Sequence, residues 1–433
     1  MIRGRGVDHL RAVPHTPARD IVEVALTWCF PGIRLAWGVL LDIIGGDIVS
    51  EEATSYDASD IQVLEGWEAV RKRPGMYVGS TGERGLRQMV FEVAERAVNE
   101  VLHGRAASVD VTLSPDGGVC VADDGPGIPI DETEAGPGLE SLLTQMQAGT
   151  GAGGRHNVSL GFCGVGPAVV NALSQRMTAE VRGGGARWVQ EYARGEAASP
   201  LTEAGTATGS GTALSFWPDA GIFGTAEFSF DALEERFREL AFLNQGLDIS
   251  LTDLRGSDEV RSVRFRFPGG VRDFVDFLDG HAAASAPGDT IVFEQEDPRM
   301  AGSMEVAFRW SSSPEERVWT FANSRPTVDG THARGFRDGM TAAVSAYARE
   351  QGLLTVTDPD VDADRIGKGL TAVVSVKLDR PEFEGSTLGW LGNAEVRDCV
   401  GQAVQDHLGR WLKENPERAA AVIDRIVHGA PRD

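Results

Sequence analysis

Two neighbouring stretches of the chain carry residue types and spacings suited to proton transfer or to holding a polar ligand. In 90–102 the apolar residues recur every three or four positions, which predicts a helix whose polar faces carry Glu92 and Arg96. In the run 123–129 (DDGPGIP), two glycines let the backbone bend and approach a ligand, while Asp123 can accept a hydrogen bond from an exocyclic amine. Such a run is by itself an ordinary turn. Together with the helix, it indicates a ligand site.

A helix followed by a hairpin must position these groups. The segments 108–113 (SVDVTL) and 118–122 (GVCVA) are typical of strands, and the Pro-Asp-Gly-Gly run at 115–118 is a turn signal between them. Asp123 would then lie at the mouth of the second strand.

Longer motifs resemble the ATPase half of the gyrase B family, within the GHKL superfamily of ATPases. The similarity runs from about residue 61 to about residue 430. The matching motifs are IQVLEGWEAVRKRPGMYVGSTGERGL at 61–86, GFCGVGPAVVNALS at 161–174, GTALSFWPD at 211–219, LAFLNQGLDISL at 240–251, DGTHARGF at 329–336 and LTAVVSVKL at 370–378. The resemblance implies an α/β (α+β) protein: a GHKL-type α/β sandwich followed by a transducer domain with a left-handed βαβ crossover.

The resemblance also divides the chain into three parts. Residues 1–55 form an N-terminal extension or arm, 56–220 a GHKL ATPase-like domain and 221–433 a transducer-like domain. In the last part we expect strands at 260–268, 304–310, 318–324 and 371–378, and helices at 271–278, 334–350, 395–414 and 414–427.

The resemblance assigns roles to several residues. Glu92 falls where the family has the carboxylate that polarises the attacking water. Asp123 matches the residue that reads the adenine amino group, Thr212 lies beside it, and Tyr77 is where family members place a ring near the adenine. The predicted nucleotide-binding glycines are those of the turn, Gly125 and Gly127, and those of the phosphate-wrapping lid, Gly161, Gly164 and Gly166.

Two departures from the family pattern affect the groups that handle charge. The family's magnesium-binding Asn is replaced by Arg96, a cation that would repel the metal and pair with a phosphate or with Glu92. The family's phosphate-binding Lys is replaced by Leu388, which has no charge. Loss of one such donor typically costs on the order of two to three decades in rate, so both changes together should nearly silence hydrolysis.

Further departures make the expected pocket less suited to a triphosphate. Pro126 and Val189 stand where the family has arginines, Trp390 replaces a polar residue, and the lid at 148–157 lacks its usual Lys. Arg155 is the candidate for a replacement lid cation. Neutral drift in a decayed copy would explain the same changes. However, the structural motifs of both domains are intact, and the changes cluster on chemistry.

Composition limits the classes of function. With 41 basic against 64 acidic residues, the net charge of −23 argues against nonspecific DNA binding, which needs a basic footprint. The cysteines at 29, 120, 163 and 399 have no pairing or metal-ligand spacing, which suits a reducing cytoplasm, and no metal cluster is evident.

The two ends of the chain carry further expectations. The apolar run at 21–49 is interrupted by Glu23, Pro31, Arg34 and Asp42, so neither a signal peptide nor a membrane anchor fits it. A misassigned start or an added amphipathic arm explains it better, and in the family such an arm crosses to a partner subunit, which predicts a homodimer. In the family a metal-binding domain follows this part of the chain, whereas this sequence ends at Asp433 without its motifs, so strand passage by this chain alone is not expected.

Two hypotheses follow. The favoured one is a gyrase-B-like pocket with its ATP-hydrolysis machinery dismantled, needing no cofactor and reassigned to a small, largely apolar metabolite of specialised metabolism. The pocket would bind that molecule or cyclise it, with Glu92 and Asp123 as acid/base or hydrogen-bonding groups and Arg96 as an oxyanion partner. The alternative is an ATP-binding or weakly hydrolysing clamp with Mg²⁺, or a self-resistance protein against gyrase inhibitors.

Overall fold

The computed structural model describes residues 66–131, 137–146, 154–161, 164–256, 260–280, 290–311, 313–385 and 388–428. All of them belong to one compact unit, Leu64–Asp433. The predicted arm at 1–55, Cys29 and Cys163 lie outside the described residues. In the part of the chain that is described, no helix is both long enough and apolar enough to span a bilayer.

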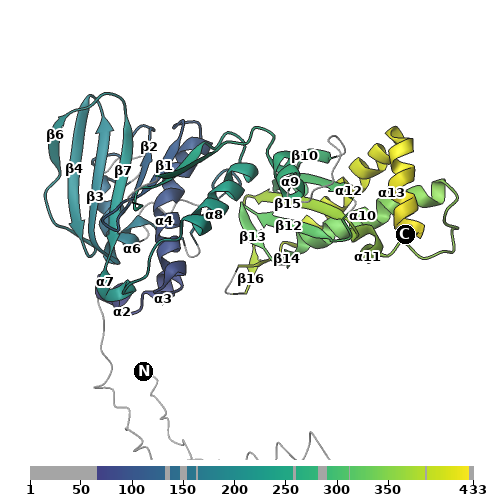
Figure 1. Ribbon diagram of the computed structural model, residues 1–433, viewed down its shortest axis with the longest axis horizontal. Helices are drawn as coiled ribbons and strands as arrows, with labels where there is room; N and C mark the ends of the chain where they lie inside the picture. The colour runs from purple at the N-terminus through teal and green to yellow at the C-terminus, as the bar shows by residue number, and fades with distance from the viewer. Residues whose placement is uncertain are drawn as a thin grey trace, which may run out of the picture. The chain divides into compact units, whose positions relative to one another are not determined.

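A nine-stranded mixed sheet forms the first half of this unit (Figure 1). Its strands run in the order β5-β4-β3-β7-β2-β1-β8-β9, with β6 paired to β4. The predicted hairpin is confirmed as an antiparallel pair, and the register of β2 with β7 sets Asp123 opposite Thr212. The strands are β1 (Val109–Leu113), β2 (Val119–Asp123), β3 (Ser174–Gly183), β4 (Ala186–Ala193), β5 (Glu196–Ala197), β6 (Thr202–Thr206), β7 (Gly211–Pro218), β8 (Ile249–Asp253) and β9 (Arg261–Phe265).

Helix α4 (Glu83–Leu102) packs its apolar face against β1 and β2, as the spacing of its apolar residues predicted. It begins seven residues before the predicted start at Val90, because Leu86 and Met89 continue the same buried stripe. The other helices of this half are α2 (Trp67–Lys72), α3 (Gly75–Val78), α5 (Leu139–Thr144), α6 (Pro167–Ala172), α7 (Ala220–Phe223) and α8 (Phe230–Leu243).

The first sheet extends beyond the boundary predicted near residue 220. β8 pairs in parallel with β1, and β9 pairs with β8, so the strand predicted at 260–268 belongs to this sheet and not to the second domain. Phe237 of α8 and Phe265 of β9 lie in the same core as α4. The prediction was wrong because strand pairing is decided by contacts far apart in sequence.

A five-stranded sheet, in the order β10-β11-β15-β12-β13, organises the rest of the chain. β12 and β15 are parallel and α10 lies between them in sequence, which supplies a βαβ unit. Its strands are β10 (Ile291–Asp297), β11 (Gly302–Trp310), β12 (Arg317–Ala322), β13 (Arg325–Thr327) and β15 (Leu370–Leu378).

This sheet is buried on both faces. Val374 and Val376 pack into one core with α10 and α12, whereas Val373 packs into another with α9. The predicted helices are confirmed within a few residues as α9 (Val271–Gly280), α10 (Thr331–Glu350), α12 (Ala394–Glu414) and α13 (Pro416–His428). The short α11 (Ala363–Gly367), a 3₁₀ turn η2 (Pro298–Met300) and a small sheet of β14 (Asp329–Gly330), β16 (Phe383–Glu384) and β17 (Trp390–Leu391) complete this half.

Glycines let α10 and α12 approach closely, which makes their crossing sensitive to added volume. A Cβ on Gly339 would lie 2.4 Å from the carbonyl oxygen of Gly401, so we expect Gly339→Ala to lower the free energy of unfolding by about 1–3 kcal/mol. Gly409, also in α12, has no atom within 4 Å of such a Cβ. Gly409→Ala should therefore be neutral or stabilising. Urea unfolding of both variants tests this, and equal effects would contradict the close crossing.

Candidate functional site

One face of α4 forms the wall of a cleft of about 640 Å³. Glu92, Glu95, Arg96 and Asn99 lie on this wall because they follow one another at spacings of one helical turn or less. Other segments contribute polar side chains, those of Asn157, Ser159, Asn323 and Arg325, together with apolar and backbone groups. The apolar and backbone groups include those of Leu142, Val158, Gly164, Gly166, Pro167, Ala322, Pro381 and Phe383.

Glu92, the predicted water-polarising carboxylate, is almost completely buried. Its Oε2 accepts a hydrogen bond from the amide of Gly166 at 2.9 Å, and its Oε1 accepts one from Gln88 Nε2 at 2.9 Å. Burial raises the pKa of Glu92, although these hydrogen bonds and Arg325 act in the opposite direction. A side chain on Gly161 would collide with this carboxylate, since its Cβ would lie 2.0 Å from Oε1.

Glu95 lies one turn further along α4 and holds the neighbouring loop. Its Oε2 accepts hydrogen bonds from the amides of Leu160 at 2.9 Å and Gly161 at 3.2 Å. Burial, together with the negative charge of Glu92, raises the pKa of Glu95 to about 7. Two of the lid glycines predicted to cradle phosphate oxygens, Gly161 and Gly166, thus donate their amides to Glu95 and Glu92 here.

Arg96 does not pair with Glu92, which was one of the two predicted partners. Its guanidinium forms an ion pair with Asp123 and lies 3.8 Å from Glu100 Oε1. Burial raises the pKa of Asp123, against the lowering effect of Arg96 and of the Gly125 amide. Asp123, the residue predicted to read an adenine amino group, is therefore engaged by a cation of this chain.

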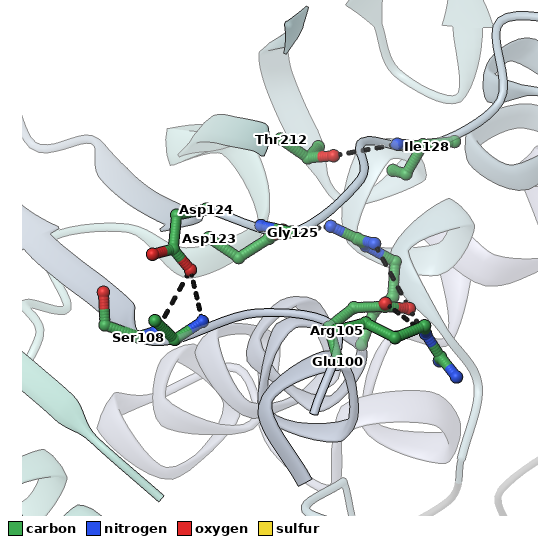
Figure 2. Close-up of polar contacts among 10 residues, drawn as sticks. Glu100, Arg105, Ser108, Asp123, Asp124, Gly125, Ile128 and Thr212 are labelled. Carbon is green, nitrogen blue, oxygen red and sulfur yellow. Dashed lines mark hydrogen bonds and ion pairs between the residues drawn. The ribbon is translucent and has the colours of Figure 1, made fainter. Parts of the chain in front are cut away.

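Asp123 and its neighbours form a tightly bonded turn (Figure 2). The Gly125 amide donates to Asp123 Oδ1 at 3.0 Å, and Gly127 adopts a φ of 86°, which favours glycine. Thr212 is buried, and its hydroxyl accepts a hydrogen bond from the Ile128 amide at 3.0 Å. Thr212 therefore fixes the turn.

A residue of the second sheet reaches the cleft. Arg325 at the start of β13 donates to the carbonyl oxygen of Gly161 at 2.8 Å, and its positive charge lowers the pKa values of Glu92 and Glu95. The Arg325 guanidinium also lies 5.9 Å from the centre of the Phe383 ring. The Gly161 peptide is thus held by Glu95 at its amide and by Arg325 at its carbonyl.

Other predicted residues lie elsewhere. Leu388 is half-buried with a φ of 52° and is not part of the cleft lining, to which its loop contributes Pro381 and Phe383. Tyr77 packs against the first core. Arg155, the candidate lid cation, pairs with Glu296 and lies 3.3 Å from Asp379, beside a separate cleft of about 240 Å³.

The structure thus gathers only part of the predicted site. Glu92, Arg96, Gly164 and Gly166 line the cleft, and Arg96 links it to Asp123. Sequence reasoning missed Glu95 as a site residue, although its place on the polar face of the predicted helix was visible. It also missed Arg325 and Phe383, for which no local signal exists.

The residues present do not fit a magnesium ion. Arg96, predicted to stand where the family has its metal-binding amide, places a guanidinium in the cleft, and a cation cannot serve as a ligand to Mg²⁺. Among the described residues, no group of three or more His, Cys, Asp or Glu side chains could hold a metal.

The fold and the cleft define a class of protein. Residues 81–221 match the family model of the histidine kinase-, DNA gyrase B- and HSP90-like ATPases, and residues 270–432 match that of DNA gyrase B. A Thermus thermophilus gyrase B 43K ATPase domain, solved in complex with an aminocoumarin, is 33% identical, with a TM-score of 0.70 over 85% of this chain and 95% of that one. The chain belongs to the DNA gyrase B family.

Full-length relatives are more similar still in sequence. The DNA gyrase B protein of Streptomyces coelicolor is 45% identical over 88% of this chain and 58% of its own length. The corresponding protein of Micrococcus luteus is 44% identical over 86% of this chain and 57% of its own length. The chain therefore spans somewhat more than half the length of these relatives.

Proposed function

We propose that this gyrase-B-type pocket no longer couples ATP hydrolysis and instead binds, or binds and cyclises, a small molecule with a largely apolar body. The observation that carries this proposal is the ion pair between Arg96 and Asp123. Arg96, which replaces the family's metal-binding Asn, thereby also engages Asp123, the carboxylate that would read adenine. A nucleotide would have to break a partly buried charge pair before its base could bind.

The groups around the cleft support the same proposal. The glycine-loop amides donate to Glu92 and Glu95, so a triphosphate would face two carboxylates where it needs donors. Leu388 supplies no cation, and the apolar lining, with Phe383 among it, suits an organic body. A dimer formed through residues 1–55 is also part of this proposal.

Hydrolysis assays on the native protein and binding titrations on a double variant test the loss of ATP chemistry. We expect the native protein to hydrolyse ATP at background rate with Mg²⁺, and the Arg96→Asn, Leu388→Lys double variant to bind a non-hydrolysable ATP analogue more tightly than the native protein does. A control with two exposed changes, Arg337→Asn and Leu353→Lys, should behave like the native protein. Magnesium-dependent hydrolysis by the native protein that disappears in Glu92→Gln would overturn the proposal.

The second candidate is an ATP-binding clamp, favoured by the retained Asp123, Thr212 and lid glycines and by the gyrase B family membership. Sequestration of a gyrase inhibitor is a variant of the small-molecule role, since one similar structure holds an aminocoumarin. In titrations, the clamp would bind the ATP analogue, and a sequestering protein would bind the inhibitor.

A further inference from the structure

The polar groups of the cleft differ in how far they are already engaged. Three guanidinium groups and three carboxylates line it. Arg96 is paired with Asp123, Arg105 donates twice to Glu100, at 2.7 and 3.1 Å, and Arg325 donates to the Gly161 carbonyl. Each of these guanidinium groups thus already holds an acceptor.

The carboxylates are not equally engaged. Glu100 is held by Arg105, and both oxygens of Glu92 accept hydrogen bonds. In Glu95, Oε2 accepts two amides, whereas Oε1 accepts no hydrogen bond from any described residue. Among the three carboxylates that line the cleft, Glu95 therefore keeps one oxygen open, and a carboxylate oxygen calls for a donor on the ligand.

We propose that the cleft takes a small molecule with an apolar body and one protonated amine, and that Glu95 Oε1 binds that amine. The amine would lie between Glu95 and Glu92, and the body would lie against Leu142, Val158 and Phe383, which line the same cleft. An ammonium near an aromatic ring and a carboxylate gains from both contacts. This assignment rests on the small-molecule role proposed above and names its ligand class.

Binding of the amine at Glu95 should be accompanied by release of a proton, because of the charged groups around this side chain. Glu92 on the same helix and Arg325 of β13 are the charged groups that act on it, and its pKa is raised to about 7. An ammonium bound at Oε1 would lower that pKa, so Glu95 would lose its proton to the buffer as the amine binds. Proton release should occur near pH 6.5 and vanish at pH 9.

Calorimetry with a matched pair of probes tests the proposal. Naphthylmethylamine and the neutral naphthylmethanol have the same apolar body, and the two would be titrated into the full chain at pH 6.5 in phosphate and in Tris. We expect the amine to bind roughly tenfold or more tightly than the alcohol, and its observed enthalpy to differ between the buffers by the released proton. Glu95→Gln should abolish both the preference and the proton release. Glu191→Gln, on an exposed residue of β4, should preserve both.

Three results would overturn the amine assignment: equal binding of the two probes, no binding of either at about 1 mM, or an amine preference that survives Glu95→Gln. An ATP analogue titrated in the same series separates the two proposals. If the analogue does not bind and the amine is not preferred over the alcohol, only the amine assignment fails. If the analogue binds with Mg²⁺, the small-molecule role itself fails.

Discussion

Glu95→Gln is expected to stabilise the protein at pH 8 and to have little effect at pH 5. The pKa of Glu95 is raised from 4.5 in the unfolded chain to about 7 in the fold. For such a group, the stabilising contribution is fully present below pH 4.5 and is lost as pH rises through about 7. The shift corresponds to about 3 kcal/mol lost by pH 8, which the uncharged Gln does not lose.

The Gln side chain also keeps the structural role of the carboxylate. Its carbonyl oxygen can still accept the amides of Leu160 and Gly161, so the loop stays in place. Urea unfolding at both pH values measures the effect, with Glu191→Gln as the exposed control. We expect the variant to gain about 2–3 kcal/mol relative to the native protein between pH 5 and pH 8. A gain that is the same at both pH values would show that Glu95 is ionised throughout.

Asp279→Ala is expected to destabilise the protein strongly. Asp279 at the end of α9 is completely buried and forms an ion pair with Arg309 of β11, and the hydroxyl of Thr371 donates to its Oδ1 at 2.7 Å. Removing the carboxylate would leave the Arg309 guanidinium, whose side chain is 8% exposed, with only the partly exposed Asp276 at 3.0 Å.

The cost should be about 3–5 kcal/mol, because breaking a buried ion pair from one side leaves a buried charge without compensation. Asp276→Ala is the matched control, since it removes the exposed partner of the same guanidinium and should cost less than about 1 kcal/mol. Thermal and urea unfolding of the two variants measure the difference. Similar losses of unfolding free energy in both variants would contradict a larger contribution from the buried Asp279–Arg309 pair.

Local patterns predicted the elements of this fold well. The apolar spacing of α4, the turn between β1 and β2 and the helices of the second half are encoded in neighbouring residues, and the structure confirms them. The place of β9 could not be predicted, because its pairing with β8 depends on contacts between segments far apart in sequence.

The same limit applied to the site. The types of Arg96 and Leu388 indicated that charge had changed, but the partner of Arg96 depends on which carboxylate the fold brings near, and that is Asp123. Arg325 reaches Gly161 from the second sheet, a contact that no local pattern encodes. Glu95 was visible on the polar face of α4, yet only its burial beside Glu92 sets it apart from a solvated carboxylate.

Calorimetric titration of the native chain with a non-hydrolysable ATP analogue and Mg²⁺ would show whether the Arg96–Asp123 pair closes this pocket to nucleotide. We expect no binding at concentrations up to about 1 mM, and measurable binding once Arg96→Asn and Leu388→Lys are introduced together. Micromolar binding by the native chain would contradict this expectation and would make the ATP-binding clamp the function to pursue.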